Sequence, residues 1–207
     1  MAVPHSDPPE LVAAKRAARD AARLARGEGD AAADRVVCER LLALIPPGLA
    51  VSGTWPLPGE LDLRPLLAAL HARGQAVLLP ETTPRGTPLV FRRWTPDTPM
   101  VPGRFGTSHP DAEAADPQLL LVPLLAFDDR LMRLGYGGGY YDRTLAGLPG
   151  CRAIGFAYAR QQVASIPTGP HDMPLDAIVT EAGVLTASMG SAQTRKGSED
   201  PLIPLLK

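Results

Sequence analysis

The sequence predicts an α/β protein with an open, mostly parallel sheet and helices on both faces, a Rossmann-like three-layer sandwich. Short apolar runs alternate with helical segments along the chain, which is typical of such sheets. One of these runs, residues 118–127 (QLLLVPLLAF), is almost entirely apolar, as expected of a strand buried on both faces. The chain has 207 residues and is 45% apolar, so one main core is expected.

The first half of the chain is predicted to begin with two helices, at residues 10–26 and 30–44. The first is dense in Ala, Leu, Arg and Lys, which are strong helix formers, and Gly27 ends it. The second has Asp30 as its N-cap and ends before Pro46. A strand at 49–55, a helix at 62–73 capped by Asp62, and strands at 75–79 and 89–94 follow. Residues 95–117, rich in Pro, Gly, Asp and Thr, are predicted to form a long loop.

The second half begins with the buried strand, in which Pro123 must lie near the end, where no ladder N–H is needed. A glycine-rich loop, a helix at 140–148, a strand at 153–157 and a last strand at 177–180 are predicted to follow. Residues 10–187 are therefore expected to form a single domain. Residues 1–9 are expected to be flexible, and residues 188–207 to be a disordered tail.

Composition excludes several classes of function. With 21 basic and 22 acidic side chains the net charge is -1, so the chain has no electrostatic reason to bind nucleic acid. Cys38 and Cys151 cannot form a disulfide framework and are interpreted as reduced core thiols. No apolar run approaches the roughly 18 residues of a membrane helix, and the first residues lack the pattern of a secretion signal. We therefore expect a cytoplasmic protein that does not contact membranes and acts as a monomer.

Basic residues recur at spacings of three and four along the first predicted helix, at Lys15, Arg19, Arg23 and Arg26. This spacing predicts that they share one face of the helix. On this stretch alone, a solvated surface face is the simpler interpretation.

The most informative segment is 133–143 (RLGYGGGYYDR), which places four glycines within five positions between a strand and a helix. The backbone amides of such a loop, with the helix start behind them, favour phosphate binding. The pattern is not GxGxxG, because Tyr140 takes the last glycine position, and no GxxxxGK[ST] motif exists. A tightly turning loop without a ligand is the alternative.

Charged residues flank this loop. Arg133 is a fixed cation suited to phosphate oxygens, and Asp142 is a hard oxygen ligand for the Mg²⁺ that accompanies a nucleoside triphosphate. Asp142 could instead stabilise the first turn of its helix. A second carboxylate, Asp172, would suffice with Asp142 because Mg²⁺ usually takes one or two. Asp176 competes for this assignment, and both residues could merely shape a turn.

From Lys15 to about Glu181 the chain resembles the 5-formyltetrahydrofolate cyclo-ligase family, also called methenyltetrahydrofolate synthetases. Several separated elements carry the resemblance: a KRxxR element (Lys15, Arg16, Arg19), VSGTWPLPGELD (with Trp55 and Glu60), LVPLLAFDDRLMRLGYGGGYYDRTL, and IGFAYARQQVASIPTGPHDMPLDAIVTE (with Gln161, Pro167 and the pair His171 and Asp172). Their order along the chain makes the match specific, which the glycine motif alone would not be.

The resemblance implies a catalytic domain over residues 10–187 that uses ATP and Mg²⁺ to close 5-formyltetrahydrofolate into 5,10-methenyltetrahydrofolate, releasing ADP and phosphate. It implies catalytic roles for Lys15, Arg133 and Tyr141. It also implies ATP contacts from Lys15, Arg19, Arg133, Leu134, Gly135, Tyr136, Gly137, Gly138, Gly139, Tyr140 and Tyr141; folate contacts from Trp55, Glu60 and residues 136–140; and Mg²⁺ ligands at Asp142 and Asp172. For Trp55 and the tyrosines, core packing is the alternative.

The chain also departs from the family pattern. The family often carries Gly-Phe-Gly-Ile-x-Glu-Pro in the long loop, whereas His109 stands here in place of the acid, so we assign that loop no catalytic role. Leu124 and Leu125 replace a common glycine-valine type pair. Two rival functions stay open: a sugar-phosphate isomerase that needs no ATP, and a folate- or nucleotide-binding protein without turnover.

Overall fold

The computed structural model describes residues 7–187; the predicted tail and most of the predicted flexible start lie outside this range. In chain order its elements are α1 (Pro9–Arg26), α2 (Ala31–Leu44), β1 (Val51–Ser52), α3 (Arg64–Ala72), β2 (Val77–Glu81), β3 (Val90–Trp94), β4 (Met100–Pro102), η1 (Arg104–Gly106), β5 (Ser108–Pro110), β6 (Leu119–Pro123), β7 (Ala126–Phe127), β8 (Arg133–Leu134), α4 (Tyr140–Gly147), β9 (Arg152–Phe156), η2 (Ala159–Gln161), β10 (Ala177–Val179) and β11 (Val184–Thr186). No helix within the described range is both long and apolar enough to cross a membrane.

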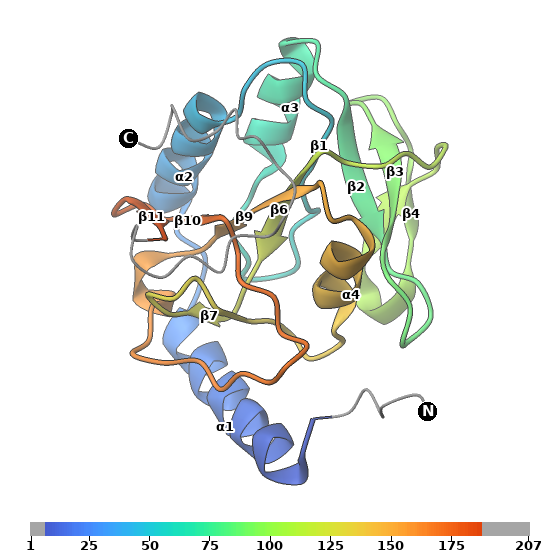
Figure 1. The fold of residues 1–207 in the computed structure, drawn as a ribbon. Helices are drawn as coiled ribbons and strands as arrows, with labels where there is room; N and C mark the ends of the chain where they lie inside the picture. Colours follow the sequence, from blue (N-terminus) through green and yellow to red (C-terminus); the bar gives the residue numbers. More distant parts are fainter. Residues whose placement is uncertain (1–6, 188–207) are drawn as a thin grey trace.

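The main sheet has seven strands in the order β11-β10-β9-β6-β1-β2-β3 (Figure 1). Neighbours among β10, β9, β6, β1 and β2 run parallel, whereas the edge strands β3 and β11 are antiparallel to the strands beside them. The predicted mostly parallel sheet is confirmed. The prediction that 177–180 is the last strand is wrong, because β11 follows it after a tight turn.

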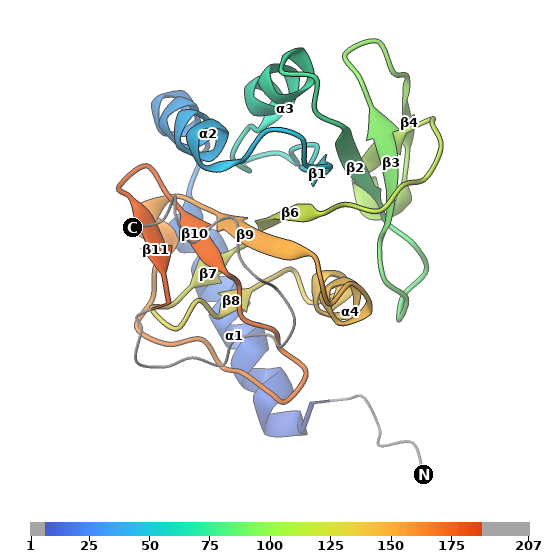
Figure 2. The same ribbon diagram turned by 45° about the horizontal axis from the view of Figure 1, so that its top comes forward.

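Helices cover both faces of the sheet, with α2 and α3 on one side and α4 on the other (Figure 2). Side chains alternate along β6, so Leu119 and Leu121 pack in the core beneath α2 and α3, while Leu120 and Val122 pack on the α4 side. All four are fully buried. The continuous apolar run of this strand therefore reflects burial on both faces, and the three-layer prediction is confirmed.

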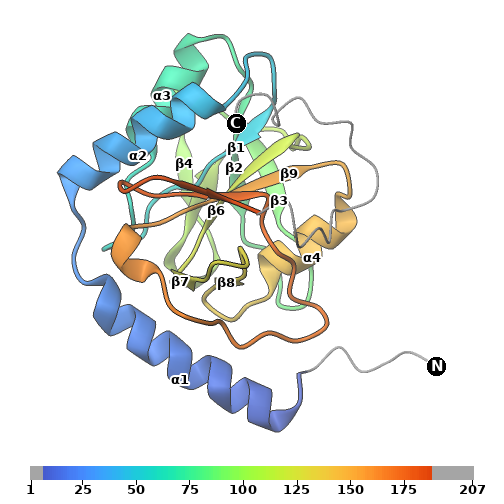
Figure 3. The same cartoon turned by 60° about the vertical axis from the view of Figure 1, so that its left-hand side comes forward.

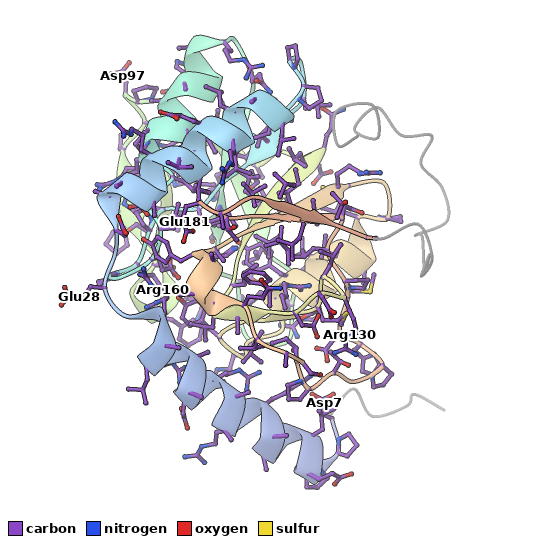
Figure 4. All side chains as sticks on the ribbon, turned by 90° about the vertical axis from the view of Figure 1, so that its left-hand side faces the viewer. Asp7, Glu28, Asp97, Arg130, Arg160 and Glu181 are labelled. Atoms are coloured by element: carbon purple, nitrogen blue, oxygen red, sulfur yellow. The ribbon has the colours of Figure 1, made fainter. Side chains whose placement is uncertain are left out.

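Helix α1 lies apart from the sheet, along the β7–β8 hairpin and η2 (Figure 3). Its Ala22 is buried against Leu125 and Leu134. Its end is fixed by Arg160, whose Nε donates to the carbonyl of Arg26 and whose Nη2 donates to that of Glu28, each at 2.6 Å (Figure 4). The helix is thus held alongside the loops that follow β6.

Local predictions hold where a cap or a buried run specifies them. Asp30 caps α2 by accepting hydrogen bonds from the amides of Ala32 and Ala33 at 3.0 and 3.1 Å. Asp62, the predicted cap of the next helix, accepts from the amide of Arg64, and that helix begins only at Arg64. The strand predicted at 49–55 pairs only at Val51–Ser52.

The prediction that 95–117 is one loop is wrong, because β4 and β5 pair within it as an antiparallel hairpin. These strands are three residues long, include Pro102 and Pro110, and show no alternation of apolar and polar side chains. The hairpin packs against β2 and β3, so its tip lies near the carboxyl end of β2.

Candidate active site

A cleft of about 850 Å³ opens at the carboxyl ends of the central strands, where ligands bind in open α/β sheets. Its walls come from α1, the loop after β1, the turn after β2, the tip of the β4–β5 hairpin, the glycine loop with the start of α4, and the loop before β10. Every predicted site residue lines this cleft: Lys15, Arg19, Trp55, Glu60, residues 133–142 and Asp172.

The glycine loop has a shape that only glycine adopts readily. Gly137 and Gly139 have φ values of +98° and +65°, which side chains with a Cβ rarely take. A Cβ on Gly137 would lie 3.1 Å from Cζ of Arg19, and one on Gly139 would lie 2.6 Å from Nη1 of Arg143. The loop therefore lies closely against two arginines that side chains would push away.

The amides of this loop are uncommitted. Across residues 7–187, no hydrogen bond is donated by the N–H groups of Gly137, Gly138 or Gly139. Helix α4 begins directly after them at Tyr140, so its first amides add partial positive charge at the same place. Three free donors in a row beside a helix start are suited to an anion with several oxygens.

Two cations from α1 line the same cleft. The buried ammonium of Lys15 donates to Asp7 at 2.7 Å and to Asp172 at 2.6 Å. Burial lowers the pKa of Lys15, but the hydrogen bonds to Asp172 and Asp7 outweigh it and raise the pKa above its ordinary value. Arg19 Nε donates to the carbonyl of Gly135 at 2.9 Å. The cleft therefore keeps a protonated lysine on its wall and an arginine at the glycine loop.

The predicted basic face of this helix is wrong for Arg23. At about 100° per residue, Arg19 and Arg26 lie within roughly 40° of Lys15 around the helix axis, whereas Arg23 lies about 80° away. Arg23 instead pairs with Asp20 on the exposed surface, at 3.1 Å. The face of α1 that is turned toward the rest of the protein repeats at 15, 19, 22 and 26. It includes the buried Ala22, which a spacing of basic residues cannot reveal.

Arg133 and Asp142 form a fixed pair at the edge of the loop. Arg133 Nη2 lies 2.7 Å from Oδ1 of Asp142, and its Nη1 donates to the carbonyl of Met173. The amide of Met173 donates to the same Oδ1 of Asp142 at 3.2 Å. Asp142 is thus oriented by Arg133 and by the loop before β10, in addition to lying in the first turn of α4.

The predicted metal ligands suit a small, hard cation. Asp172 Oδ2 accepts from Lys15 and from the amide of Gly169 at 2.6 Å. Asp142 and Asp172 each keep one oxygen that makes no hydrogen bond within residues 7–187. No group of three or more His, Cys, Asp or Glu side chains that could hold a metal occurs in that range. Two carboxylates with open oxygens fit Mg²⁺, which completes its shell with water and phosphate.

Asp176, the competing candidate, is placed elsewhere. Its Oδ2 accepts the amide of Ala153 at 2.6 Å and lies 3.7 Å from Nε of Arg152. It is absent from the cleft wall. Its carboxylate therefore fixes the start of β9, away from the cleft.

Tyr136 closes the cleft on one side. Its hydroxyl donates to Oε1 of Glu60 in a short hydrogen bond and accepts from Nη1 of Arg26 at 2.7 Å. Burial and the nearby Glu60 carboxylate raise the pKa of Tyr136, so the hydroxyl stays protonated. This contact ties the glycine loop to the loop after β1 and to α1.

Three other aromatic residues of the cleft wall also pack against the core. Trp55 packs against Trp94, with ring centroids 6.4 Å apart, and it also lines the cleft. Tyr140 donates its hydroxyl to the carbonyl of Thr83 at 2.9 Å. Burial raises the pKa of Tyr141, whose hydroxyl makes no hydrogen bond to any described residue. Trp55 therefore packs against the core as the alternative expects, and it lines the cleft together with Tyr140 and Tyr141; their contacts to ligands stay a prediction.

Sequence reasoning missed several wall residues. Asp7 falls in the segment predicted to be flexible, yet its carboxylate reaches Lys15 near the start of α1 (Figure 4). Phe105, Thr107 and Ser108 line the cleft from the long loop to which no catalytic role was assigned. A solvent-facing aromatic in a Pro- and Gly-rich stretch was the available signal for Phe105, whereas nothing in the sequence marks Asp7 as a site residue.

Comparison with known proteins gives consistent relatives. The model of the 5-formyltetrahydrofolate cyclo-ligase family matches residues 9–181. The chain is 36% identical over 135 residues to 5-formyltetrahydrofolate cyclo-ligase of Escherichia coli strain K12, covering 61% of this chain and 74% of that protein. It is 38% identical over 126 residues to the Haemophilus influenzae protein of the same name, covering 56% and 67%.

Solved structures show the same fold. The NMR structure of Aquifex aeolicus 5,10-methenyltetrahydrofolate synthetase superposes with a TM-score of 0.71 at 26% identity, covering 90% of this chain and 99% of that one. The 5,10-methenyltetrahydrofolate synthetase of Mycoplasma pneumoniae superposes with a TM-score of 0.66 at 21% identity, covering 81% and 98%. The fold similarity therefore spans nearly the whole of both neighbours.

Proposed function

Since the chain belongs to the 5-formyltetrahydrofolate cyclo-ligase family, we propose that its cleft binds ATP beside 5-formyltetrahydrofolate and closes the folate to 5,10-methenyltetrahydrofolate, releasing ADP and phosphate. The main observation that supports this function for the cleft is the run of three glycine amides before α4 that donate no hydrogen bond within residues 7–187. Such a run is suited to the oxygens of a triphosphate.

The phosphates lie, in this proposal, on the amides of residues 137–139 with cations on two sides. Lys15 and Arg19 approach from α1, and Arg133 approaches from β8. Several fixed cations are needed because the transferred phosphoryl group carries negative charge on its oxygens and further negative charge develops on the leaving oxygen of ADP. The protein contributes positioning and charge neutralisation and needs no covalent nucleophile.

Asp142 and Asp172 would hold Mg²⁺ through their open oxygens. When bound, the metal would neutralise charge on the phosphates. The support for this assignment is the chemistry of the donors: hard oxygens in a pair, on the wall that also carries the glycine loop.

The folate lies against the loop after β1 and the aromatic residues of the glycine loop. Trp55 and Tyr140 offer flat faces for the pterin, and Glu60 is a carboxylate that can accept from pterin N–H groups. Tyr136 now uses Glu60 as its acceptor, so the pterin would take over that partner. This arrangement places the folate next to the phosphate loop, as transfer between the two substrates requires.

In the reaction the formyl oxygen attacks the terminal phosphate of ATP, and ADP leaves. The neighbouring folate nitrogen then attacks the activated carbon and loses its proton, and phosphate departs as the ring closes. An amide-like oxygen is a poor leaving group, and phosphorylation turns it into a good one. Arg133 and Lys15 neutralise the transferred group, and the protonated hydroxyl of Tyr141, which lines the same cleft, donates a hydrogen bond to it.

The direct test mixes purified protein with 5-formyltetrahydrofolate, ATP and Mg²⁺ and follows the absorbance of methenyltetrahydrofolate. Product that forms only with ATP present supports the proposal. Turnover of a sugar phosphate without ATP, with no product from the folate, would favour the isomerase class. Binding of both substrates without product would favour a non-catalytic protein. A cytoplasmic location and a monomeric state stay predictions, to be checked by fractionation of the source cells and by light scattering.

A further inference from the structure

One basic residue of the cleft wall has no polar partner within the described part of the chain. Five Lys and Arg side chains line the cleft, and four of them donate hydrogen bonds to carboxylates or carbonyls: Lys15, Arg19, Arg133 and Arg143. The fifth, Arg85, makes no hydrogen bond or ion pair to any residue between 7 and 187. Its guanidinium therefore keeps all its donors for a ligand.

Arg85 is nevertheless held in place. Its Cζ lies 5.2 Å from the ring centroid of Phe105, at the tip of the β4–β5 hairpin, in a cation–π contact. Phe105 is 60% exposed and has a φ of +56°, a conformation that residues other than glycine seldom adopt. Backbone strain of this kind is found at ligand sites, where surrounding structure holds it. The hairpin thus presents an aromatic ring that orients the arginine at the cleft.

The charge around Arg85 favours an anion. The acidic residues of the cleft wall come from other elements: Asp7, Glu60, Asp142 and Asp172. The side chains that the turn after β2 and the hairpin tip contribute to the wall are neutral or basic: Thr82, Arg85, Leu89, Phe105, Thr107 and Ser108. A ligand carboxylate bound on this part of the wall would be attracted by Arg85 and would not be repelled by acidic side chains of the same part.

We propose that Arg85 binds the carboxylates of the glutamate part of the folate substrate and sets a preference for substrates with several glutamates. This inference rests on the proposed function, which places the pterin after β1. Strand β2 lies beside β1 in the sheet, and the loops that follow both strands line the same cleft. A folate tail that leaves a pterin bound after β1 can therefore extend toward the turn that carries Arg85. The planar guanidinium matches a carboxylate in a two-point contact.

The test compares 5-formyltetrahydrofolate carrying one glutamate with the same compound carrying three, using the absorbance assay with ATP and Mg²⁺. Arg85→Gln should raise KM for the triglutamate about 5-fold and KM for the monoglutamate less, as expected for an exposed ion pair. The kcat and the KM for ATP should stay at wild-type values. Arg104→Gln is the matched control, because Arg104 is exposed on the same hairpin tip but does not line the cleft.

The outcomes separate the two proposals. If wild-type protein forms no methenyl product from either folate, the proposed function fails. If wild-type protein is active but Arg85→Gln and Arg104→Gln give equal KM values, or Arg85→Gln raises KM for ATP instead, the role of Arg85 is overturned. Added NaCl should raise the triglutamate KM of the wild type more than that of the Arg85 variant, since screening acts on the same ion pair.

Discussion

Replacing Gly137 by alanine tests the phosphate cradle directly. The native φ of +98° is costly for alanine, by about 1–2 kcal/mol, and the new Cβ would lie 3.1 Å from Cζ of Arg19. The loop would relieve both strains by rotating its amides and moving Arg19. A hydrogen bond to a charged acceptor contributes roughly 1.5–3 kcal/mol. Losing one should therefore lower kcat/KM for ATP by about 10- to 100-fold.

Gly74→Ala is the matched control for this change. Gly74 follows α3 with a φ of +76°, and nothing lies within 4 Å of a Cβ built there. It is also absent from the cleft wall. Both variants should lose a similar free energy of unfolding in urea, but only the Gly137 variant should lose ATP affinity. A Gly137 variant that matches the Gly74 variant in stability and keeps the wild-type KM for ATP would refute the cradle.

Two further changes test the carboxylate pair and a buried tyrosine. Asp142→Asn removes the charge that faces Arg133 and would face the metal, so turnover should fall by at least about 100-fold. The control variant Asp97→Asn, at an exposed turn, should keep wild-type turnover (Figure 4). Equal turnover of the two variants at limiting Mg²⁺ would contradict the assignment of Asp142. Burial and the hydrogen bond to Asp34 raise the pKa of Tyr158 to about 12. The folded protein therefore keeps a proton on this hydroxyl that the unfolded chain loses from about pH 10. The free energy of unfolding should fall as the pH rises from about 10 to about 12. Tyr158→Phe should be less stable at neutral pH but lose less over that interval, and parallel urea curves for both proteins from pH 8 to 12 would exclude this tyrosine as the titrating group.

The inner strands could be predicted because burial on both faces leaves an unmistakable apolar run. Leu119 to Val122 are all fully buried, and the apolar run predicts this burial without knowledge of the strands that pack beside it. The two small hairpins could not be predicted in the same way. Their strands, such as Ala126–Phe127 and Arg133–Leu134, have two or three residues, too few for any periodicity to appear. Their strands are held by packing against the rest of the fold, and they place the glycine loop and Phe105 at the cleft.

Residue types at the site were predictable where one short segment carries several of them. Residues 133–142 come from one stretch, and all of them line the cleft. Among the residues from other segments, Asp172 was identified as a carboxylate suited to Mg²⁺, whereas Trp55 and Glu60 were identified only through the family resemblance. The interpretation of four basic residues as one face of α1 failed at Arg23, because charge spacing does not show which side of a helix is buried.

Sequence could identify the cations and the carboxylates of the site but not that they pair with one another. Lys15 and Asp172 are 157 positions apart, and Arg133 and Asp142 are nine apart across a loop and a helix start. Each pair joins a predicted phosphate ligand to a predicted metal ligand at 2.6 or 2.7 Å. Removing either partner would leave a poorly hydrated charge, so the pairs hold the cleft in shape.

Under the proposed function, the same pairs predict that a metal-bound triphosphate binds in this cleft better than either component alone. Phosphate oxygens satisfy the ammonium and the guanidinium, and a divalent ion satisfies the open carboxylate oxygens, so the charge brought in matches both members of each pair. A triphosphate without metal would face Asp142 and Asp172 as like charges, and a metal without phosphate would face Lys15 and Arg133. The two pairs therefore favour binding of the metal and the nucleotide together, because each ligand removes the repulsion that the other would meet.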